Sequence, residues 1–195
     1  MRVGVFGGSF DPVHWAHLVI AEQAREQVAL DRVLFVPAAR PPHKQTQPLS
    51  TFAHRATMLR LAIAGHLAFE VSEVEKDRPG PSYTVATLED LRRCHPEADL
   101  FLILGGDSLR DFPNWREPER IASMATLVAA PRPGYLVQSL PNWVRLQEIQ
   151  VPLLEISSTD IRKRVASGRS IRYLVPRAVE CYIEAHGLYR NTPAV

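Results

Sequence analysis

Residues 4–18 read G-V-F-G-G-S-F-D-P-V-H-W-A-H-L, and this stretch decides the fold. An apolar run ends at Gly7-Gly8, and two histidines, His14 and His17, follow where an amphipathic helical pattern begins. This order predicts a buried strand, a glycine turn and the first turn of a helix. Glycines let the backbone approach a bulky anion, and a helix N-terminus offers unpaired N–H groups and a positive dipole. Histidines three residues apart share one helical face, so both can face the same phosphate.

The rest of the chain alternates apolar strands with helices. Strands are predicted at residues 2–6, 32–36, 69–74, 100–104, 126–130 and 151–156. Helices are predicted at 15–28, from 50 or 51 to 64, from 82 or 84 through 94, in a short segment ending at 123, at 158–165 and at 176–186. Irregular chain is expected at 135–150, with one helical turn around 143–146. The alternation predicts an α/β, Rossmann-like fold: a doubly wound parallel sheet of about six strands with helices on both faces.

Length and composition narrow the class of protein. The 195 residues suit one domain, 1–195, and their 46% hydrophobic and 23% charged content is that of a globular protein. A net charge of +2 is too small to indicate a nucleic-acid surface. The sequence shows no signal peptide and no apolar run approaching the ~18 residues of a membrane span, so a cytoplasmic protein is expected. Cys94 and Cys181 are expected to be idle thiols.

Four polar motifs come directly after predicted strands. They are G-G-S-F-D-P-V-H at 7–14, P-P-H-K at 41–44, G-G-D-S at 105–108 and I-S-S-T-D-I-R at 156–162. In a doubly wound sheet, ligands bind outside the carboxyl ends of the strands, where the strand order reverses. The first motif matches neither G-x-G-x-x-G nor G-x-x-x-x-G-K-[ST], which argues against a nicotinamide-dependent dehydrogenase and a P-loop NTPase.

Several residues in these motifs have two interpretations. His14 and His17 are either phosphate contacts, because a histidine at a helix start beside a glycine turn can donate to phosphate oxygens, or surface histidines with no role. A zinc site would need further ligands that the nearby chain does not offer. Lys44, on a proline-stiffened loop, is either a phosphate contact or a solvated lysine. Asp107 is either a ribose ligand or a helix cap. Trp115 is either core or a stacking platform for a flat heterocycle, and spacing alone favours core.

The motif at 156–162 is predicted to begin a helix. Its serine hydroxyls and backbone N–H groups can form an anion nest, and Arg162 can give forked phosphate contacts. The alternative is an ordinary capping box with a surface arginine. Together the four motifs supply donors and cations, with no nucleophile beside a base and no carboxylate pair. Such a set suits phosphoryl or nucleotidyl transfer, in which the phosphates themselves bring Mg²⁺.

The motifs resemble those of a known family. The run at 7–17 resembles the first signature, H-x-G-H, of the nucleotidyltransferase superfamily, and I-S-S-T-D-I-R resembles its second. Within the superfamily, P-P-H-K at 41–44, P-S-Y-T-V-A-T at 81–87 and G-G-D-S-L-R-D-F-P-N-W at 105–115 resemble the bacterial nicotinate-nucleotide adenylyltransferases. One departure is Ala16, where the family usually has glycine. A methyl group there is expected to narrow the space near the phosphates without abolishing activity.

The resemblance implies a reaction and a set of site residues. ATP and nicotinate mononucleotide would give deamido-NAD and pyrophosphate by in-line attack, with Mg²⁺ carried by ATP, no organic cofactor and no metal held by the protein. It implies that the catalytic residues are His14, His17 and Arg162. The implied ATP-binding residues are Gly7, Gly8, Ser9, Phe10, His14, His17, Gly106, Asp107, Ile156, Ser157, Ser158 and Arg162. The implied mononucleotide-binding residues are Lys44, Thr84, Asp107, Trp115 and Arg132. A C-terminal helical part at about 157–190 would complete the ATP site.

Two alternatives stay open at this point, one among the enzymes of the same superfamily and one from another functional class. A pantetheine-phosphate adenylyltransferase or a cytidylyltransferase would share the first motif, but the length and the motifs around Thr84 and Trp115 speak against them. A nucleotide-binding regulator without catalytic activity would be expected to lack His14, His17 or Arg162, which are all present. Small-molecule substrates are expected, with no nucleic acid or membrane partner, and the oligomeric state is left open.

Overall fold

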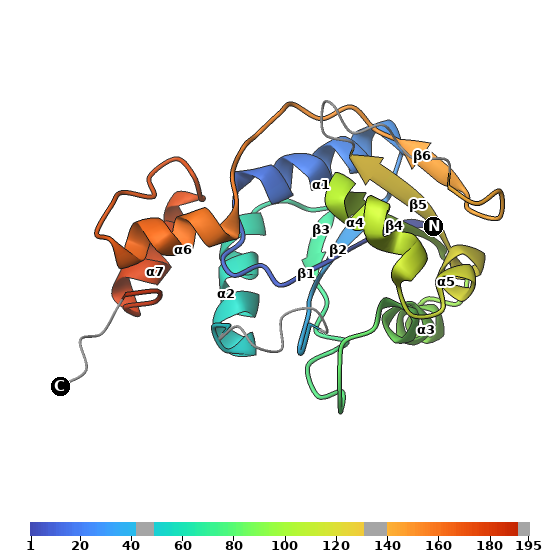
Figure 1. The fold of residues 1–195 in the computed structure, drawn as a ribbon, viewed down its shortest axis with the longest axis horizontal. Coiled ribbons are helices and arrows are strands. Elements are labelled where there is room, and N and C mark those ends of the chain that lie inside the picture. The colour runs from blue at the N-terminus through green and yellow to red at the C-terminus, as the bar shows by residue number, and fades with distance from the viewer. Residues whose placement is uncertain (42–48, 131–139, 191–195) are drawn as a thin grey trace.

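The computed structural model describes residues 1–41, 49–130 and 140–190, and within them six strands form one sheet (Figure 1). The strands are β1 (Arg2–Gly8), β2 (Arg32–Pro37), β3 (Phe69–Val71), β4 (Asp99–Gly105), β5 (Ala125–Ala130) and β6 (Leu146–Glu148). Their order is β3-β2-β1-β4-β5-β6, and every neighbouring pair is parallel. This is the strand order of the doubly wound nucleotide-binding sheet, so the predicted fold class is confirmed.

Helices cover both faces of the sheet. They are α1 (Trp15–Gln27), α2 (Phe52–Ile63), α3 (Thr84–Cys94), α4 (Gly106–Asp111), α5 (Pro118–Met124), α6 (Ser158–Ala166) and α7 (Arg177–Ala185). Successive strand residues point to opposite faces, so Phe6 and Phe35 join one apolar core whereas Val5 and Leu34 join another. The first core receives side chains from α1, α2, α6 and α7, and the second receives them from α3, α4 and α5.

The arrangement of β1 and β4 determines where a ligand can bind. These two strands lie side by side at the centre of the sheet, with Arg2 opposite Asp99 and Val5 opposite Leu102. The chain leaves β1 toward β2 on one side and leaves β4 toward β5 on the other. The strand order therefore reverses between them, and their carboxyl ends, which carry the glycine motifs, form the switch point of the sheet.

The sixth strand was predicted in the wrong place. It is Leu146–Glu148, inside the stretch expected to be irregular, and it pairs with β5 from Leu127↔Leu146 to Ala129↔Glu148. Residues 151–156 form no strand; they contain Pro152, which lacks an N–H donor. Val151 and Ile156 pack against the first core as the chain crosses to α6, an extended segment visible along the top of Figure 1.

Other boundaries also differ from the predictions. The third strand was predicted to run to residue 74 but ends at Val71. It lies at the edge of the sheet, where it has a single neighbouring strand. Residues 106–111 form a short helix that was not predicted, and 112–114, expected to be loop, form a 3₁₀ turn. Thr51 caps α2 by accepting the His54 N–H at 3.3 Å, as one of the two predicted candidates. The N-cap of α3 is Tyr83, and neither Ser82 nor Thr84 takes that position.

The C-terminal helices α6 and α7 lie to one side of the sheet, beside α2 (Figure 1). The His54 ring nitrogen Nδ1 lies 2.9 Å from the Tyr182 hydroxyl, which joins α2 to α7. Cys94 and Cys181 are free thiols on the surface. None of the helices within the described ranges has the length and apolar character needed to cross a membrane.

Candidate active site

The glycine loop, residues 7–10, begins inside β1: Gly7 and Gly8 are the last two residues of that strand and pair with Val36 and Pro37, so the predicted turn at these glycines is wrong. The segment leaves open space at Gly7. A Cβ added at Gly7 would meet no atom within 4 Å, whereas one at Gly8 would lie 3.0 Å from the Phe10 ring. The loop is fixed from below by Arg55, which is 2% exposed and donates to the Ser9 carbonyl at 2.9 Å. A bulky anion can therefore approach the backbone at Gly7 without displacing a side chain.

His14 and His17 meet at the start of α1. His14 is the N-cap, and its backbone N–H donates to Nδ1 of His17 at 3.2 Å. Because Nδ1 of His17 accepts a hydrogen bond, its ring proton sits on Nε2, which makes Nε2–H a donor. The two imidazole rings stack with their centroids 3.7 Å apart and their planes at 28°.

The His14 ring is held neutral by its surroundings. It is 5% exposed, and burial lowers its pKa from 6.5 to about 4. Its Nδ1 atom is buried without a hydrogen-bond partner among the described residues. An unpaired buried polar atom costs about 1–3 kcal/mol, so the fold holds this imidazole at a cost in stability.

The start of α6 is bonded to the chain that leads into α1. Ser158 donates its hydroxyl to the Pro12 carbonyl at 2.9 Å, and Arg162 donates from Nη1 to the Asp11 carbonyl at 2.8 Å. Ser157 caps the helix by accepting the Asp160 N–H at 3.0 Å. The Ser157 side chain therefore acts as an ordinary helix cap, which was the alternative interpretation of this motif. The hydroxyl proton of Ser158 is likewise donated within the protein, to the Pro12 carbonyl.

A cavity of about 130 Å³ opens at the carboxyl ends of β1 and β4, and its lining includes Gly7, Gly8, Gly105, Thr84 and Trp115. Thr84 is the first residue of α3, whose N-cap side chain makes no capping hydrogen bond. Among the described residues no side chain caps the first N–H groups of this helix, so they can bind an anion.

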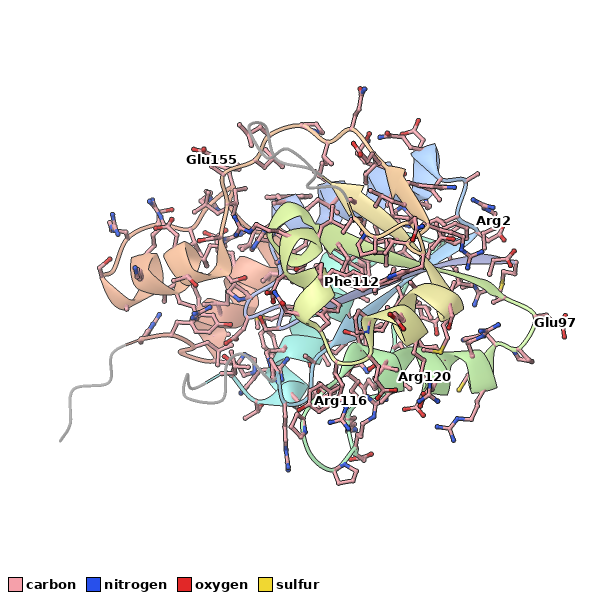
Figure 2. All side chains as sticks on the ribbon, turned by 45° about the vertical axis from the view of Figure 1, so that its right-hand side comes forward. Arg2, Glu97, Phe112, Arg116, Arg120 and Glu155 are labelled. Carbon is pink, nitrogen blue, oxygen red and sulfur yellow. The ribbon has the colours of Figure 1, made fainter. Side chains whose placement is uncertain are left out.

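Trp115 packs against the core and also lines the cavity, so its environment suits both predicted interpretations, core residue and stacking platform. Its ring packs edge-on against Phe112, with the centroids 5.7 Å apart and the planes at 61°. Phe112 is fully buried and lies in the middle of Figure 2, whereas Arg116, the residue after Trp115, lies at the lower surface. Trp115 thus has one edge against the second core and also lines the cavity.

Comparisons with known proteins identify the family of the chain. The cytidylyltransferase-like family matches residues 5–164. A probable nicotinate-nucleotide adenylyltransferase of Thermus thermophilus is 55% identical over 97% of this chain and 100% of its own length. A probable nicotinate-nucleotide adenylyltransferase of Thermomicrobium roseum is 48% identical over 100% of this chain and 94% of its own. The chain belongs to the nicotinate-nucleotide adenylyltransferases of the cytidylyltransferase-like family.

A solved structure shows the same fold in a more distant member. Nicotinic acid mononucleotide adenylyltransferase of Plasmodium falciparum, complexed with NaAD, superposes with a TM-score of 0.80 at 20% identity. The match covers 96% of this chain and 97% of that one. At this identity the likeness concerns the fold alone, and the assignment of this chain to the adenylyltransferases rests on the closer sequence relatives.

The structure does not describe some of the predicted site residues of this adenylyltransferase. Lys44 and Arg132 lie in the ranges 42–48 and 131–139, which the structure does not describe. Asp107 is the second residue of α4, directly after Gly106, and its side chain is likewise outside the description. Ile156 packs against the first core, so its backbone is the part that remains for a ligand.

Three residues that hold the site together were not singled out from the sequence. Asp11 is 1% exposed and accepts from the Tyr189 hydroxyl at 2.6 Å and from the Ser50 N–H at 3.1 Å. Burial raises the pKa of Tyr189, so its hydroxyl stays a donor to Asp11. Arg55 supports the glycine loop, and burial lowers its pKa. Asp11 did stand inside the quoted motif, but nothing in the sequence indicates partners so distant along the chain.

Outside this cavity the described surface offers neither a metal site nor a second hollow with predicted site residues. In the part of the chain that is described, no group of three or more His, Cys, Asp or Glu side chains stands close enough to hold a metal ion. A larger hollow of about 430 Å³ between α1 and the end of α2 is lined by Trp15, His66 and Phe69. It contains none of the predicted site residues, so the smaller cavity at the switch point remains the candidate site.

Proposed function

We propose that this chain transfers the adenylyl group of ATP to nicotinate mononucleotide, giving deamido-NAD and pyrophosphate. An oxygen of the mononucleotide phosphate bonds to the α-phosphorus of ATP, the bond from that phosphorus to the α–β bridging oxygen breaks, and pyrophosphate leaves with the electron pair. One observation carries the proposal: the cavity at the start of α3 opens at the carboxyl ends of β1 and β4, and the chain that follows β1 is bonded to the start of α6.

We assign the ATP side to the glycine loop, the two histidines and the start of α6. Donors that are fixed before the reaction stabilise charge that develops in the transition state, and this is commonly the largest part of catalysis. The Nε2–H of His17 is such a donor, because its tautomer is set by the His14 backbone. Arg162 keeps N–H groups for the triphosphate beyond those that donate to the Asp11 carbonyl and to the Thr159 hydroxyl. On this assignment the helical part 157–190 completes the ATP site.

We assign the mononucleotide side to the cavity. Trp115 would stack on the pyridine ring, and the uncapped N–H groups at the start of α3 would bind the nicotinate carboxylate. Lys44, Asp107 and Arg132 are proposed for the same substrate or for the phosphates between the two, on the strength of the motifs alone. We infer that Mg²⁺ enters with the ATP phosphates, since this ion is usually held by few protein groups and by substrate phosphates.

The proposal is tested by product analysis. Purified protein is incubated with ATP and, in turn, nicotinate mononucleotide, nicotinamide mononucleotide and phosphopantetheine, and pyrophosphate and dinucleotide are quantified. Deamido-NAD as the main product is expected. Preferred use of phosphopantetheine would favour the pantetheine-phosphate enzyme, and no pyrophosphate with any acceptor would favour the regulator.

The role of His17 gives a sharper prediction within the same assay. His17→Ala removes one fixed donor to the transferred phosphate, which typically costs about 3 kcal/mol, or roughly a hundredfold in kcat. The KM for the mononucleotide should change little. His186→Ala on α7 is the control, since His186 is exposed and bonds to the Tyr182 carbonyl. Near-normal turnover by a folded His17→Ala protein would remove His17 from the catalytic residues.

A further inference from the structure

A buried carboxylate that no sequence motif singled out lies in the wall of the mononucleotide cavity. Glu75 is 5% exposed and lines the cavity together with Thr84 and Thr87. It follows β3 in the chain, and its side chain reaches two other segments. A buried carboxylate is stable only where donors and a cation surround it, so its partners indicate what it holds.

The two oxygens of Glu75 bind two segments that border the cavity, the end of β2 and α3, which we call its two walls. Oε2 accepts the backbone N–H of Ala39, just beyond the end of β2, at 3.2 Å. Oε1 accepts the hydroxyl of Thr87, which is 4% exposed and lies on α3. Thr87 follows Thr84 by three residues, so the two share one face of the helix, and both line the cavity.

Arg78 balances the charge of this carboxylate. Its Nη1 lies 3.9 Å from Oε1 of Glu75 and donates to the Thr87 hydroxyl oxygen at 2.9 Å. Its Nη2 donates to Asp90, one turn further along α3. Glu75, Thr87, Arg78 and Asp90 therefore form one connected network beneath the cavity. A second link joins the same walls at their outer edge, where Arg40 and Ser82 exchange two hydrogen bonds of 3.0 and 2.9 Å.

We propose that Glu75 is a positioning residue for the mononucleotide: by binding Ala39 on one wall and Thr87 on the other, it sets the width of the cavity and the position of the α3 start. This inference rests on the proposed function of the cavity. It differs from a role in ATP binding, because the network of Glu75 lies on the face of the sheet opposite α1 and α6. Displacement of a substrate-binding group by about 1 Å can cost about a hundredfold in rate.

The test measures binding of each substrate separately by calorimetric titration. Glu75→Ala should weaken nicotinate mononucleotide binding at least tenfold and change the Kd of a non-hydrolysable ATP analogue less than twofold. Thr87→Val, which keeps the side-chain volume and removes the hydroxyl, should give the same split with a smaller effect. Glu73→Ala is the matched control, because Glu73 lies two residues away and pairs with Arg60 and Lys76 at the surface.

The conservative variant Glu75→Gln distinguishes a role of Glu75 in positioning the cavity walls from a role of its negative charge. In Glu75→Gln the amide oxygen can accept from Ala39, and the amide nitrogen can donate to the Thr87 hydroxyl, which can turn toward the Tyr83 carbonyl 3.3 Å away. Glu75→Gln is therefore expected to recover most of the mononucleotide affinity. Equal losses in the Gln and Ala variants would overturn the positioning role in favour of charge.

The remaining outcomes are also decisive. Equal weakening of both substrates in Glu75→Ala and Thr87→Val would show a general structural defect and would overturn the inference. Unchanged mononucleotide binding in both variants would do the same. Failure of the proposed function is read separately, from the product assay on the unmodified protein. Mononucleotide binding by that protein without product formation would refute the proposed reaction and leave the Glu75 test intact, whereas no binding at all would overturn both.

Discussion

A single side chain, His14, couples folding to pH. Its pKa is lowered from 6.5 in the unfolded chain to about 4 in the fold, because the ring is buried. Between these values the unfolded chain binds more protons than the folded protein, so the free energy of unfolding rises with pH. His14 should therefore remove about 3 kcal/mol of stability as the pH falls from 6.5 to 4, since each pKa unit corresponds to about 1.36 kcal/mol.

Urea denaturation of His14→Asn checks this prediction. Asparagine does not titrate and is a favoured N-cap residue, so the start of α1 should persist. The loss of unfolding free energy between pH 7 and pH 4.5 should be smaller in this variant than in the unmodified protein by about 2 to 3 kcal/mol. His186→Asn, at an exposed position, should keep the full pH dependence. The same slope in all three proteins would contradict the assignment of His14.

At the scale of one element, the start of α3 is expected to select the acid over the amide. Proline is well tolerated at the first position of a helix and has no N–H, and the preceding Tyr83 is already extended at φ −87°, ψ 132°, as a residue before proline must be. Thr84→Pro thus deletes one N–H while the helix remains. If that N–H binds the nicotinate carboxylate, its loss should lower the ratio of kcat/KM for nicotinate over nicotinamide mononucleotide by roughly 5- to 150-fold, because an unmade hydrogen bond costs about 1–3 kcal/mol.

Thr84→Val is the matched control for this change, because it deletes only the hydroxyl. It should keep a larger share of the acid preference than Thr84→Pro does. An unchanged ratio in the proline variant, with normal helix content, would mean that another group reads the carboxylate. Equal use of both mononucleotides by the unmodified protein would contradict the nicotinate assignment and leave the broader adenylyltransferase activity.

The elements that were predicted correctly are those whose sequence alone determines them. The apolar runs of β1 and β4 end at glycines, and this pattern needs no tertiary context. β6 was misplaced because L-Q-E acquires strand conformation only by pairing with β5, whereas the more apolar run at 151–156 packs without pairing. The partners of Glu75 lie 36 residues before it and 12 after it, so its role was visible only in the fold.

At the scale of the whole molecule, the helices proposed for the two substrates lie on opposite faces of the sheet, and the glycines at the end of β1 lie between them. The helices proposed for ATP, α1 and α6, contribute to the core on one face, whereas α3 and Trp115 belong to the core on the other. This division follows from the doubly wound order, which was predicted from the alternation of strands and helices. It implies that a substitution on one face should leave the binding of the other substrate unchanged.

Arg162 and Trp115 provide the variants that test this separation. Arg162→Ala should raise the KM for ATP and lower kcat, since a hydrogen bond to a charged group contributes about 1.5–3 kcal/mol. Arg162→Lys should not restore the loss, because a lysine cannot hold the Asp11 carbonyl and present a planar fork to the triphosphate at once.

Trp115→Ala should weaken the binding of both mononucleotides alike, by about 1–3 kcal/mol, because stacking does not distinguish acid from amide. The free-energy changes of substitutions at independent sites add to within about 0.5 kcal/mol. The double variant with Arg162→Ala and Trp115→Ala should therefore lower kcat/KM by the product of the two single fold-changes, to within about twofold. Lys163→Ala, which removes a positive charge from the same helix, is the control and should leave both KM values unchanged. A double variant that departs clearly from this product would show that Arg162 acts across the sheet. Full rescue by Arg162→Lys would show that Arg162 acts through its charge alone.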